Sequence, residues 1–186
     1  MNERLHSAID LAARAHQGQY RKDADMKIPY VAHVYGVAMI LQHHGFSQDV
    51  VIAGLLHDVL EDSPEFMDGV VAFGPSVQRW VETVSDPQKT GDGKGSVRGN
   101  WLERKAPYIA QIRDGDLEAK AIACADKIHN MASTLMGLER GAKSELKRPL
   151  EIQVEYWRRV REAFGAWQHP MLTRYDELLE SLAKRQ

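Results

Sequence analysis

Apolar residues recur along this chain at the three- and four-residue spacing of one helix face, and no stretch alternates apolar and polar residues as a half-buried strand does. Residues 50–60 are apolar on nearly every side, which is typical of a helix at the centre of a fold. The pattern therefore predicts an all-α fold. The other apolar stripes fall in residues 5–15, 34–41, 77–84, 121–135, 154–167 and 172–182.

Turn-forming residues separate these stripes, and Ser47 is a suitable N-cap for the helix that follows it. The longest break, Asp86 to Gly99, contains four glycines and does not match the phosphate-binding pattern of two spaced glycines followed by Lys and Ser or Thr. We expect a flexible surface loop there, and it is a candidate lid over a nearby site.

Composition narrows the class of protein. The chain has 186 residues, a formal net charge of −2 and one cysteine, Cys124, in an apolar stretch. This length fits a single domain, 1–186, with motifs over about 5–164 and a last helix at about 170–184. The near-neutral charge argues against nucleic-acid binding, and one cysteine excludes an internal disulfide. Because there is no signal-like N-terminus and no apolar run of the roughly 20 residues that span a bilayer, we expect a cytoplasmic protein without membrane partners.

Four polar residues end the most apolar helix, in the segment LLHDVLED: His57, Asp58, Glu61 and Asp62. If the helix continues, their three- and four-residue spacing puts them on neighbouring faces of its end. A buried carboxylate without a partner is costly, and a divalent cation would supply that partner. A solvated acidic cluster is the alternative, which fits less well after so apolar a run.

A second polar set lies on the helix predicted over residues 121–135. Asp126, Asn130 and Ser133 share one face there, beside the apolar stripe. Asp126 either turns toward the core or pairs with Lys127, and the sequence leaves both open.

A third set lies near the N-terminus. Pro29 suits the start of a helix that carries His33 on its first turn. Arg21 and Lys22 precede it, and charges of this kind are ordinarily solvated in a loop.

Taken in order, the segments AHQGQYRK, PYVAH, LLHDVLED, FGPSVQRWVETVSD, WLERK and ADKIHNM resemble the HD superfamily of metal-dependent phosphohydrolases. The resemblance is greatest to the hydrolase domain of RelA/SpoT proteins and their small stand-alone relatives. It implies a helical HD-domain bundle with one divalent metal, usually Mn²⁺, and His129 and His16 are expected to support the site and the fold. The metal ligands that it implies are His33, His57, Asp58 and Asp126.

The resemblance also implies roles for other residues. Glu61 and Asp62 are the catalytic pair that acts on the reacting water and the leaving group, and which is base and which is acid stays open. The substrate-binding residues that it implies are Arg21, Lys22, Asn130, Ser133 and Tyr156. Lys105 and Arg104 are further candidates for contact with phosphates.

The function implied is removal of the 3′-diphosphate from guanosine tetraphosphate or pentaphosphate, a small anionic nucleotide, to give GDP or GTP and pyrophosphate. The chain departs from the family pattern at Val34, Ala132 and Ser133, in the long 21–29 segment and in the Gly-rich insertion. These departures leave the identity of the substrate open. The alternatives are an HD phosphohydrolase for a nucleoside monophosphate, a nicotinamide dinucleotide phosphate or another phosphoester, and a non-catalytic helical module that a metal stabilises.

Overall fold

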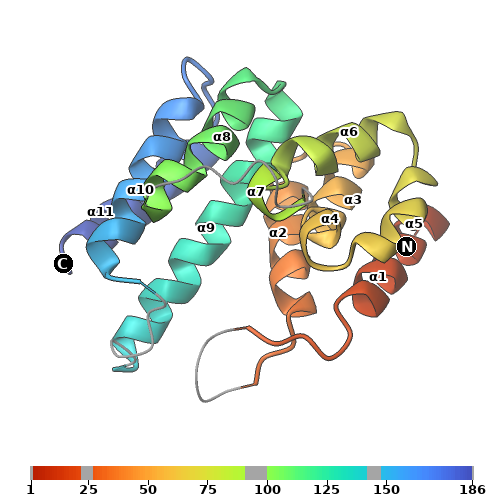
Figure 1. The fold of residues 1–186 in the computed structure, drawn as a ribbon, viewed down its shortest axis with the longest axis horizontal. Helices are drawn as coiled ribbons and strands as arrows, with labels where there is room; N and C mark the ends of the chain where they lie inside the picture. The colour runs from red at the N-terminus through yellow and green to blue at the C-terminus, as the bar shows by residue number, and fades with distance from the viewer. Residues whose placement is uncertain (1, 22–26, 91–99, 142–147, 186) are drawn as a thin grey trace.

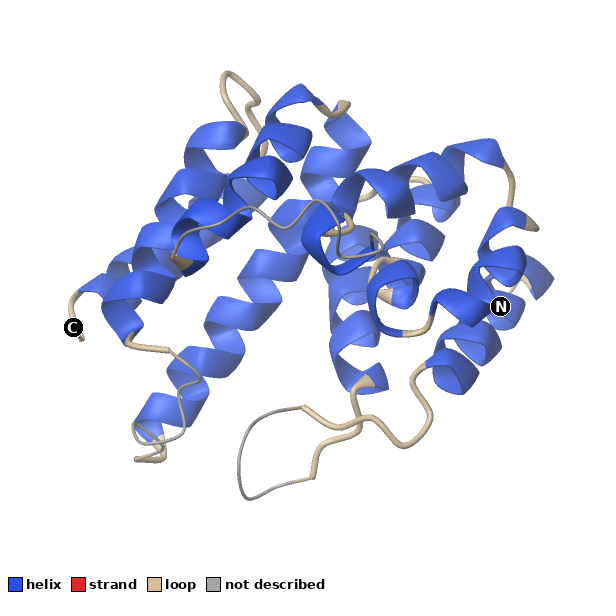
Figure 2. Cartoon of the chain, in the orientation of Figure 1, coloured by secondary structure: helices blue, strands red, loops and turns tan. Residues whose placement is uncertain are grey.

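The chain forms an all-helical bundle in the computed structural model, which describes residues 2–21, 27–90, 100–141 and 148–185 (Figures 1 and 2). These residues contain no strand beyond an isolated bridge between Tyr20 and Pro29, so the all-α prediction is confirmed. The helices are α1 (Glu3–Ala15), α2 (Val31–His43), α3 (Gln48–Leu56), α4 (Val59–Asp62), the 3₁₀ helix η1 (Pro64–Phe66), α5 (Met67–Val71), α6 (Pro75–Val84), α7 (Pro87–Thr90), α8 (Trp101–Asp114), α9 (Leu117–Glu139), α10 (Leu150–Ala163) and α11 (Met171–Ala183).

The long helix α9 lies at the middle of the bundle (Figure 1). It packs against α2, α3 and α6 on one side and against α8 and α11 on the other. The residues from Ala121 to Ile128 are all buried, including the single cysteine, Cys124. Side chains on α9 can therefore reach both halves of the molecule.

Helix α3 is the buried helix that the apolar run predicts, since every residue from Val50 to Leu56 is buried. The Ser47 side chain caps it by accepting a hydrogen bond from the Val50 backbone at 3.5 Å. The helix does not continue unbroken, as the spacing argument assumed, because His57 and Asp58 form a turn before α4 begins. Both turn residues keep right-handed helical backbone angles, so their side chains still emerge beside Glu61 on the same end.

The segment after α6 differs in part from the expected loop. Asp86 is buried, and Pro87–Thr90 form the short helix α7. The physical reason is anchoring: the Asp86 carboxylate accepts from Lys105 Nζ at 2.6 Å, and its backbone N–H donates to Glu61 at 2.6 Å. Residues 91–99, on which the lid prediction depends, lie outside the described residues.

Candidate active site

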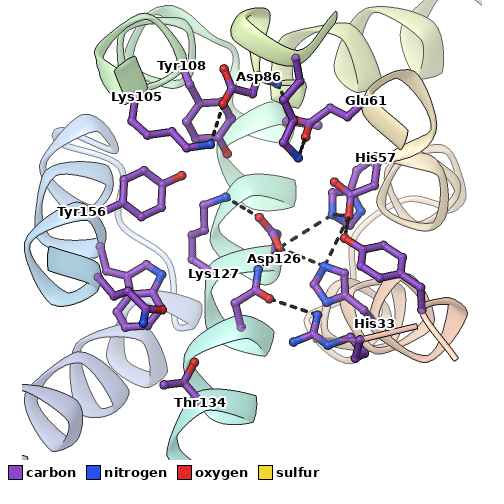
Figure 3. Close-up of a pocket in the computed structure, with 18 of the residues that line it drawn as sticks. His33, His57, Glu61, Asp86, Lys105, Tyr108, Asp126, Lys127, Thr134 and Tyr156 are labelled. Atoms are coloured by element: carbon purple, nitrogen blue, oxygen red, sulfur yellow. Dashed lines mark hydrogen bonds and ion pairs between the residues drawn. The ribbon is translucent and has the colours of Figure 1, made fainter. Parts of the chain in front are cut away.

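A cavity of about 260 Å³ lies between the α2–α4 side of the bundle and the α8–α10 side, with α9 along its floor (Figure 3). Its polar lining comes from segments far apart in the sequence, which explains how three separate motifs form one site. The charged and polar side chains that line it are Arg21, Tyr30, His33, His57, Asp58, Glu61, Asp86, Lys89, Lys105, Tyr108, Asp126, Lys127, Asn130, Thr134, Gln153 and Tyr156.

Two imidazoles and two carboxylates converge at one end of this cavity, and we call His33, His57, Asp58 and Asp126 the metal wall. His33 Nε2 lies 3.6 Å from Asp58 Oδ2 and 3.2 Å from Asp126 Oδ1. His57 Nε2 lies 3.1 Å and 3.8 Å from the same two oxygens. The ligand atoms of His33, His57 and Asp58 all lie within 4.8 Å of one another. The structure thus brings together all four ligands that the resemblance implies.

The chemistry of this wall fits a divalent cation. His57 Nδ1 lies 2.8 Å from the Gly54 carbonyl, to which it donates, and this directs Nε2 at the carboxylates. His57 Nε2 is buried and has no hydrogen bond of suitable geometry within the described residues, although a carboxylate oxygen is close by. Two nitrogen and two oxygen donors around such an atom suit Mn²⁺ and other first-row divalent ions.

The pKa shifts show a site in which burial and charge pairing oppose each other. Burial alone would lower the pKa of His57, but Asp58 and Asp126 outweigh it and raise the pKa to about 9. Burial would raise the pKa of Asp126, whereas Lys127 and the two histidines hold it well below its usual range. Without a metal, the carboxylates therefore keep a proton on His57, and a bound cation would replace that proton.

Neighbouring side chains hold the two ligand carboxylates. The Tyr30 hydroxyl donates to Asp58 Oδ2 at 2.6 Å, and the Asn130 amide donates to Asp126 Oδ1 at 2.5 Å. Asp126 Oδ2 pairs with Lys127. Both orientations that the sequence left open for Asp126 therefore occur together, because its two oxygens face in different directions.

Of the two predicted catalytic carboxylates, the structure places Glu61 at the cavity and Asp62 away from it. The Glu61 side chain is only 8% exposed, and its oxygens accept from the Asp86 backbone at 2.6 Å and from Lys89. Burial and the nearby Asp58 raise the pKa of Glu61, against the opposing effect of Lys89. Asp62 is exposed and is not part of the lining.

Some of the predicted substrate-binding residues also line the cavity, and others do not. Arg21, Asn130 and Tyr156 line the cavity, and the Arg21 guanidinium donates to the Asn130 side chain at 3.2 Å. Ser133 is half-buried and is not in the lining, whereas Thr134 is. At about 100° per residue, Asp126, Asn130 and Thr134 turn progressively toward the Lys127 side of α9, and Ser133 turns the other way. Lys22 lies outside the described residues.

Across the cavity from the two histidines lie Lys105, Tyr108 and Tyr156, and Lys127 lies between the two sides on α9, beside Asp126 (Figure 3). We call Lys105, Tyr108, Lys127 and Tyr156 the cationic wall. Lys127 Nζ lies 4.7 Å from the Tyr108 ring centre and 5.7 Å from that of Tyr156. Lys105 Nζ lies 5.9 Å from the centres of both rings. Sequence reasoning named Lys105 but missed Tyr108 and the position of Lys127 beside these rings; the available signal was the adjacent charged pair Asp126–Lys127 inside the otherwise apolar 121–128 run.

In the part of the chain that the structure describes, no helix is long and apolar enough to cross a membrane.

Comparisons with known proteins identify the family of this chain. The family model of the HD domain matches residues 8–150. Human guanosine-3′,5′-bis(diphosphate) 3′-pyrophosphohydrolase MESH1 is 38% identical over 130 residues, covering 68% of this chain and 67% of MESH1. The bifunctional (p)ppGpp synthase/hydrolase SpoT of Escherichia coli K12 is 36% identical over 132 residues, which are 69% of this chain but 18% of SpoT.

Solved structures give the same result at the level of the fold. A metazoan ortholog of SpoT, described as hydrolysing ppGpp, superposes with a TM-score of 0.77 at 27% identity, covering 97% of this chain and 96% of that one. A structure from Listeria monocytogenes EGD-e superposes with a TM-score of 0.69 at 32% identity, covering 82% of this chain and 99% of the other. With the family match over most of its length, this chain belongs to the HD domain family.

Proposed function

We propose that this protein is a metal-dependent hydrolase that removes the 3′-diphosphate from guanosine 3′,5′-bis(diphosphate) or the corresponding pentaphosphate, giving GDP or GTP and pyrophosphate. The observation that carries the proposal is the metal wall facing the cationic wall across one cavity. A metal site alone would serve many reactions, but lysines opposite it favour a substrate with several phosphate charges. MESH1 and SpoT, which share this family, are named for that reaction.

The proposed metal is one divalent ion held by the metal wall, and we propose Mn²⁺ because the family resemblance implies it and the mixed nitrogen and oxygen donors suit it. When bound, such an ion polarises a phosphoryl oxygen and lowers the pKa of a bound water. Tyr30 and Asn130 support the proposal because their hydrogen bonds hold the carboxylates of Asp58 and Asp126 in place.

We assign proton transfer from the attacking water to Glu61. Its carboxylate lines the cavity, and its raised pKa makes it a stronger base than an exposed glutamate. The Asp86 backbone and Lys89 orient it through its two oxygens. Asp62 remains the second catalytic carboxylate in this proposal, and its exposed position makes Glu61 the better candidate for the base.

We assign nucleotide binding to both ends of the cavity. Arg21 has a guanidinium that can stack on a guanine ring, and Asn130 holds it at 3.2 Å. Lys22, Ser133 and Tyr156 complete the predicted substrate set, and Lys105 and Lys127 add positive charge for the phosphates. We further propose that the chain acts as one domain in the cytoplasm.

The test is a turnover assay with purified protein, Mn²⁺ and guanosine 3′,5′-bis(diphosphate), with pyrophosphate as the measured product. We expect metal-dependent release that falls by about 100-fold or more in Glu61→Gln, the range of effect for a general base. The matched control is Glu65→Gln, which changes an exposed glutamate four residues away. Equal turnover by the two variants would contradict the role of Glu61.

A substrate panel separates the remaining functions. Nucleoside monophosphates and a nicotinamide dinucleotide phosphate would release free phosphate instead of pyrophosphate. If metal raises the melting temperature and no phosphoester is hydrolysed, the protein is a metal-stabilised module and not an enzyme.

A further inference from the structure

One histidine beside the metal wall has no role in the proposed function. His129 Nδ1 lies 2.9 Å from His33 Nδ1, so the rings of α9 and α2 are joined by a single hydrogen bond. The ring centres are 4.8 Å apart and the rings are close to perpendicular, at 63°. Only one of the two nitrogens can carry the proton in this contact, and the contact itself allows either one to be the donor.

The other nitrogen of His33 decides the direction. His33 Nε2 faces the carboxylates of Asp126 and Asp58 at 3.2 Å and 3.6 Å, where a metal ligand needs an unprotonated nitrogen. When a cation is bound at Nε2, the proton of His33 sits on Nδ1, which then donates to His129 Nδ1. We propose that His129 is a positioning residue that holds His33 in its metal-binding tautomer and ring orientation.

The partner is unusual in kind. A metal-ligating histidine ordinarily donates its second N–H to a carboxylate, a backbone carbonyl or a water, and His57 follows that rule through the Gly54 carbonyl. His33 instead has a second imidazole as its acceptor. His129 lies three residues after Asp126, so one helix carries both a metal ligand and the group that orients another ligand.

Gly36 makes this contact sterically possible. A Cβ atom added at Gly36 would lie 2.3 Å from His129 Cδ2 and 2.4 Å from His129 Nε2. Gly36 is three residues after His33 on α2, so the His129 ring occupies the volume that any other residue would fill. A glycine at position 36 is therefore needed for the contact between His129 and His33.

The inference rests on the metal site of the proposed function and not on its substrate, so its test measures metal binding. The experiment compares His129→Leu, which removes the acceptor, with His129→Asn, whose side-chain oxygen can take the place of Nδ1. Co²⁺ is titrated into each metal-free protein and followed by calorimetry and by its visible spectrum. We expect His129→Leu to bind Co²⁺ about 10- to 100-fold more weakly with an altered spectrum, as for loss of other partners of metal ligands, and His129→Asn to recover most of the affinity.

A second measurement reports the hydrogen bond of His33 directly. Nitrogen-15 and proton NMR of the imidazoles is recorded on the Zn²⁺-loaded protein, because without a metal His33 Nε2 faces two carboxylates and would itself carry the proton. We expect a slowly exchanging His33 Nδ1–H, shifted downfield by its hydrogen bond, in wild type and in His129→Asn, and its loss in His129→Leu. This readout would not move if His129 only filled space.

Gly36→Ala should weaken Co²⁺ binding as His129→Leu does. Gly69→Ala, whose Cβ would lie 2.9 Å from Leu11 Cδ1 in a different part of the core, is the matched control and should leave the affinity unchanged. Wild-type affinity in His129→Leu, or equal losses in the Leu and Asn variants, would overturn the inference while leaving the proposed function intact. Absence of metal binding by the wild type would overturn both.

Discussion

The two walls of the cavity are built on different principles. The metal wall pairs nitrogen and oxygen donors at 3.1–3.8 Å, and its histidines and Asp58 come from α2 and the turn after α3. The cationic wall places lysine ammonium groups over aromatic rings at 4.7–5.9 Å, and Lys105, Tyr108 and Tyr156 come from α8 and α10. The first arrangement can bind a small cation and the second a flexible anion.

The difference teaches how charge is balanced in a buried site. Asp126 belongs to the metal wall and Lys127 to the cationic wall, yet they are neighbours in α9 and form an ion pair. The carboxylate that would hold a metal is thus already neutralised in part by the wall that would hold phosphates. We expect changes in one wall to alter the other only through this pair.

The largest effect is expected from Asp58→Asn, which removes an anionic ligand and leaves the cationic wall unchanged. Mn²⁺ affinity and turnover should each fall by on the order of 10³-fold, since the loss of a ligand exceeds the 10- to 100-fold cost of losing a ligand's partner. Calorimetry and pyrophosphate release measure the two quantities. Asp114→Asn, at an exposed aspartate paired with Arg113, is the control and should match wild type. Retained Mn²⁺ binding in Asp58→Asn would refute the metal wall.

The next effect tests the link between the walls. Lys127→Met leaves the buried Asp126 carboxylate without its lysine, and breaking a buried ion pair costs about 3–5 kcal/mol. Urea unfolding of the metal-free protein should show a loss of this order, and Mn²⁺ should stabilise the variant more than the wild type because it replaces the missing positive charge.

The control for this link is Lys184→Met, which breaks an exposed pair with Glu180. Its effect should stay within about 1 kcal/mol, the value of a surface ion pair. If Lys127→Met behaves like Lys184→Met, the two walls are energetically independent.

Two variants with smaller expected effects should each change the binding property of one wall and leave that of the other wall unchanged. Tyr30→Phe removes a hydrogen bond to Asp58 and should weaken Mn²⁺ binding by about tenfold, with KM for the nucleotide unchanged. Lys105→Met removes a charge from the cationic wall and should raise KM by about tenfold, as for a charge-assisted hydrogen bond of about 1.5 kcal/mol, with Mn²⁺ affinity unchanged. Because it also leaves the buried Asp86 carboxylate without its lysine, it should lower the free energy of unfolding as well. Titration of Mn²⁺ and of substrate gives the Mn²⁺ affinity and the KM of each variant. The same pattern in both variants would mean that the walls are one unit.

The smallest effect concerns histidines remote from both walls. The rings of His44 and His169 lie 5.4 Å apart, with His43 beside His44, and connect the end of α2 to the segment before α11. Burial lowers the pKa of both from 6.5, and for His44 the neighbouring histidines add to the effect. Since the folded protein then binds fewer protons than the unfolded chain, stability is complete above pH 6.5 and is lost as pH falls through the lowered values.

Urea unfolding between pH 8 and pH 5, with a metal chelator present throughout, checks this expectation. His169→Gln should show a shallower loss, because it removes one titrating ring and its effect on His44. An unchanged slope would show that the acid sensitivity arises elsewhere.

The family resemblance implies all four residues of the metal wall, whereas the hydrophobic pattern alone points to His57 and Asp58 and leaves Asp126 with two alternatives, because apolar runs beside polar clusters mark where charges are buried. His57 and Asp58 follow seven consecutive buried residues, and Asp126 follows five. Spacing could not distinguish Glu61 from Asp62, because the turn at His57–Asp58 sets their final directions. Nor could spacing show which of Ser133 and Thr134 lines the cavity, because the helices packed on both sides of α9 determine which of its faces points there.

The cationic wall was harder to predict for a physical reason. Tyr108 lies on α8, whose start is set by the capping box of Asn100 and Glu103 and whose apolar stripe is weak, with Pro107 inside the helix. The aromatic ring of Tyr156 is buried among core residues of α10, so sequence spacing could not distinguish a lining residue from a packing residue. Tyr156 comes close to Lys127 only when α8, α9 and α10 pack together.

The placement of Asp126 and Lys127 on one continuous helix also limits how this protein can be redesigned. Inserting one residue in α9 ahead of Asp126 would rotate all that follows by about 100° and carry both residues off their walls at once. Changes in substrate preference are therefore best sought by exchanging side chains on α8 and α10 while α9 keeps its length. Helix α9 therefore fixes the relative positions of the active-site residues that it carries, and we expect insertions to be tolerated only outside it.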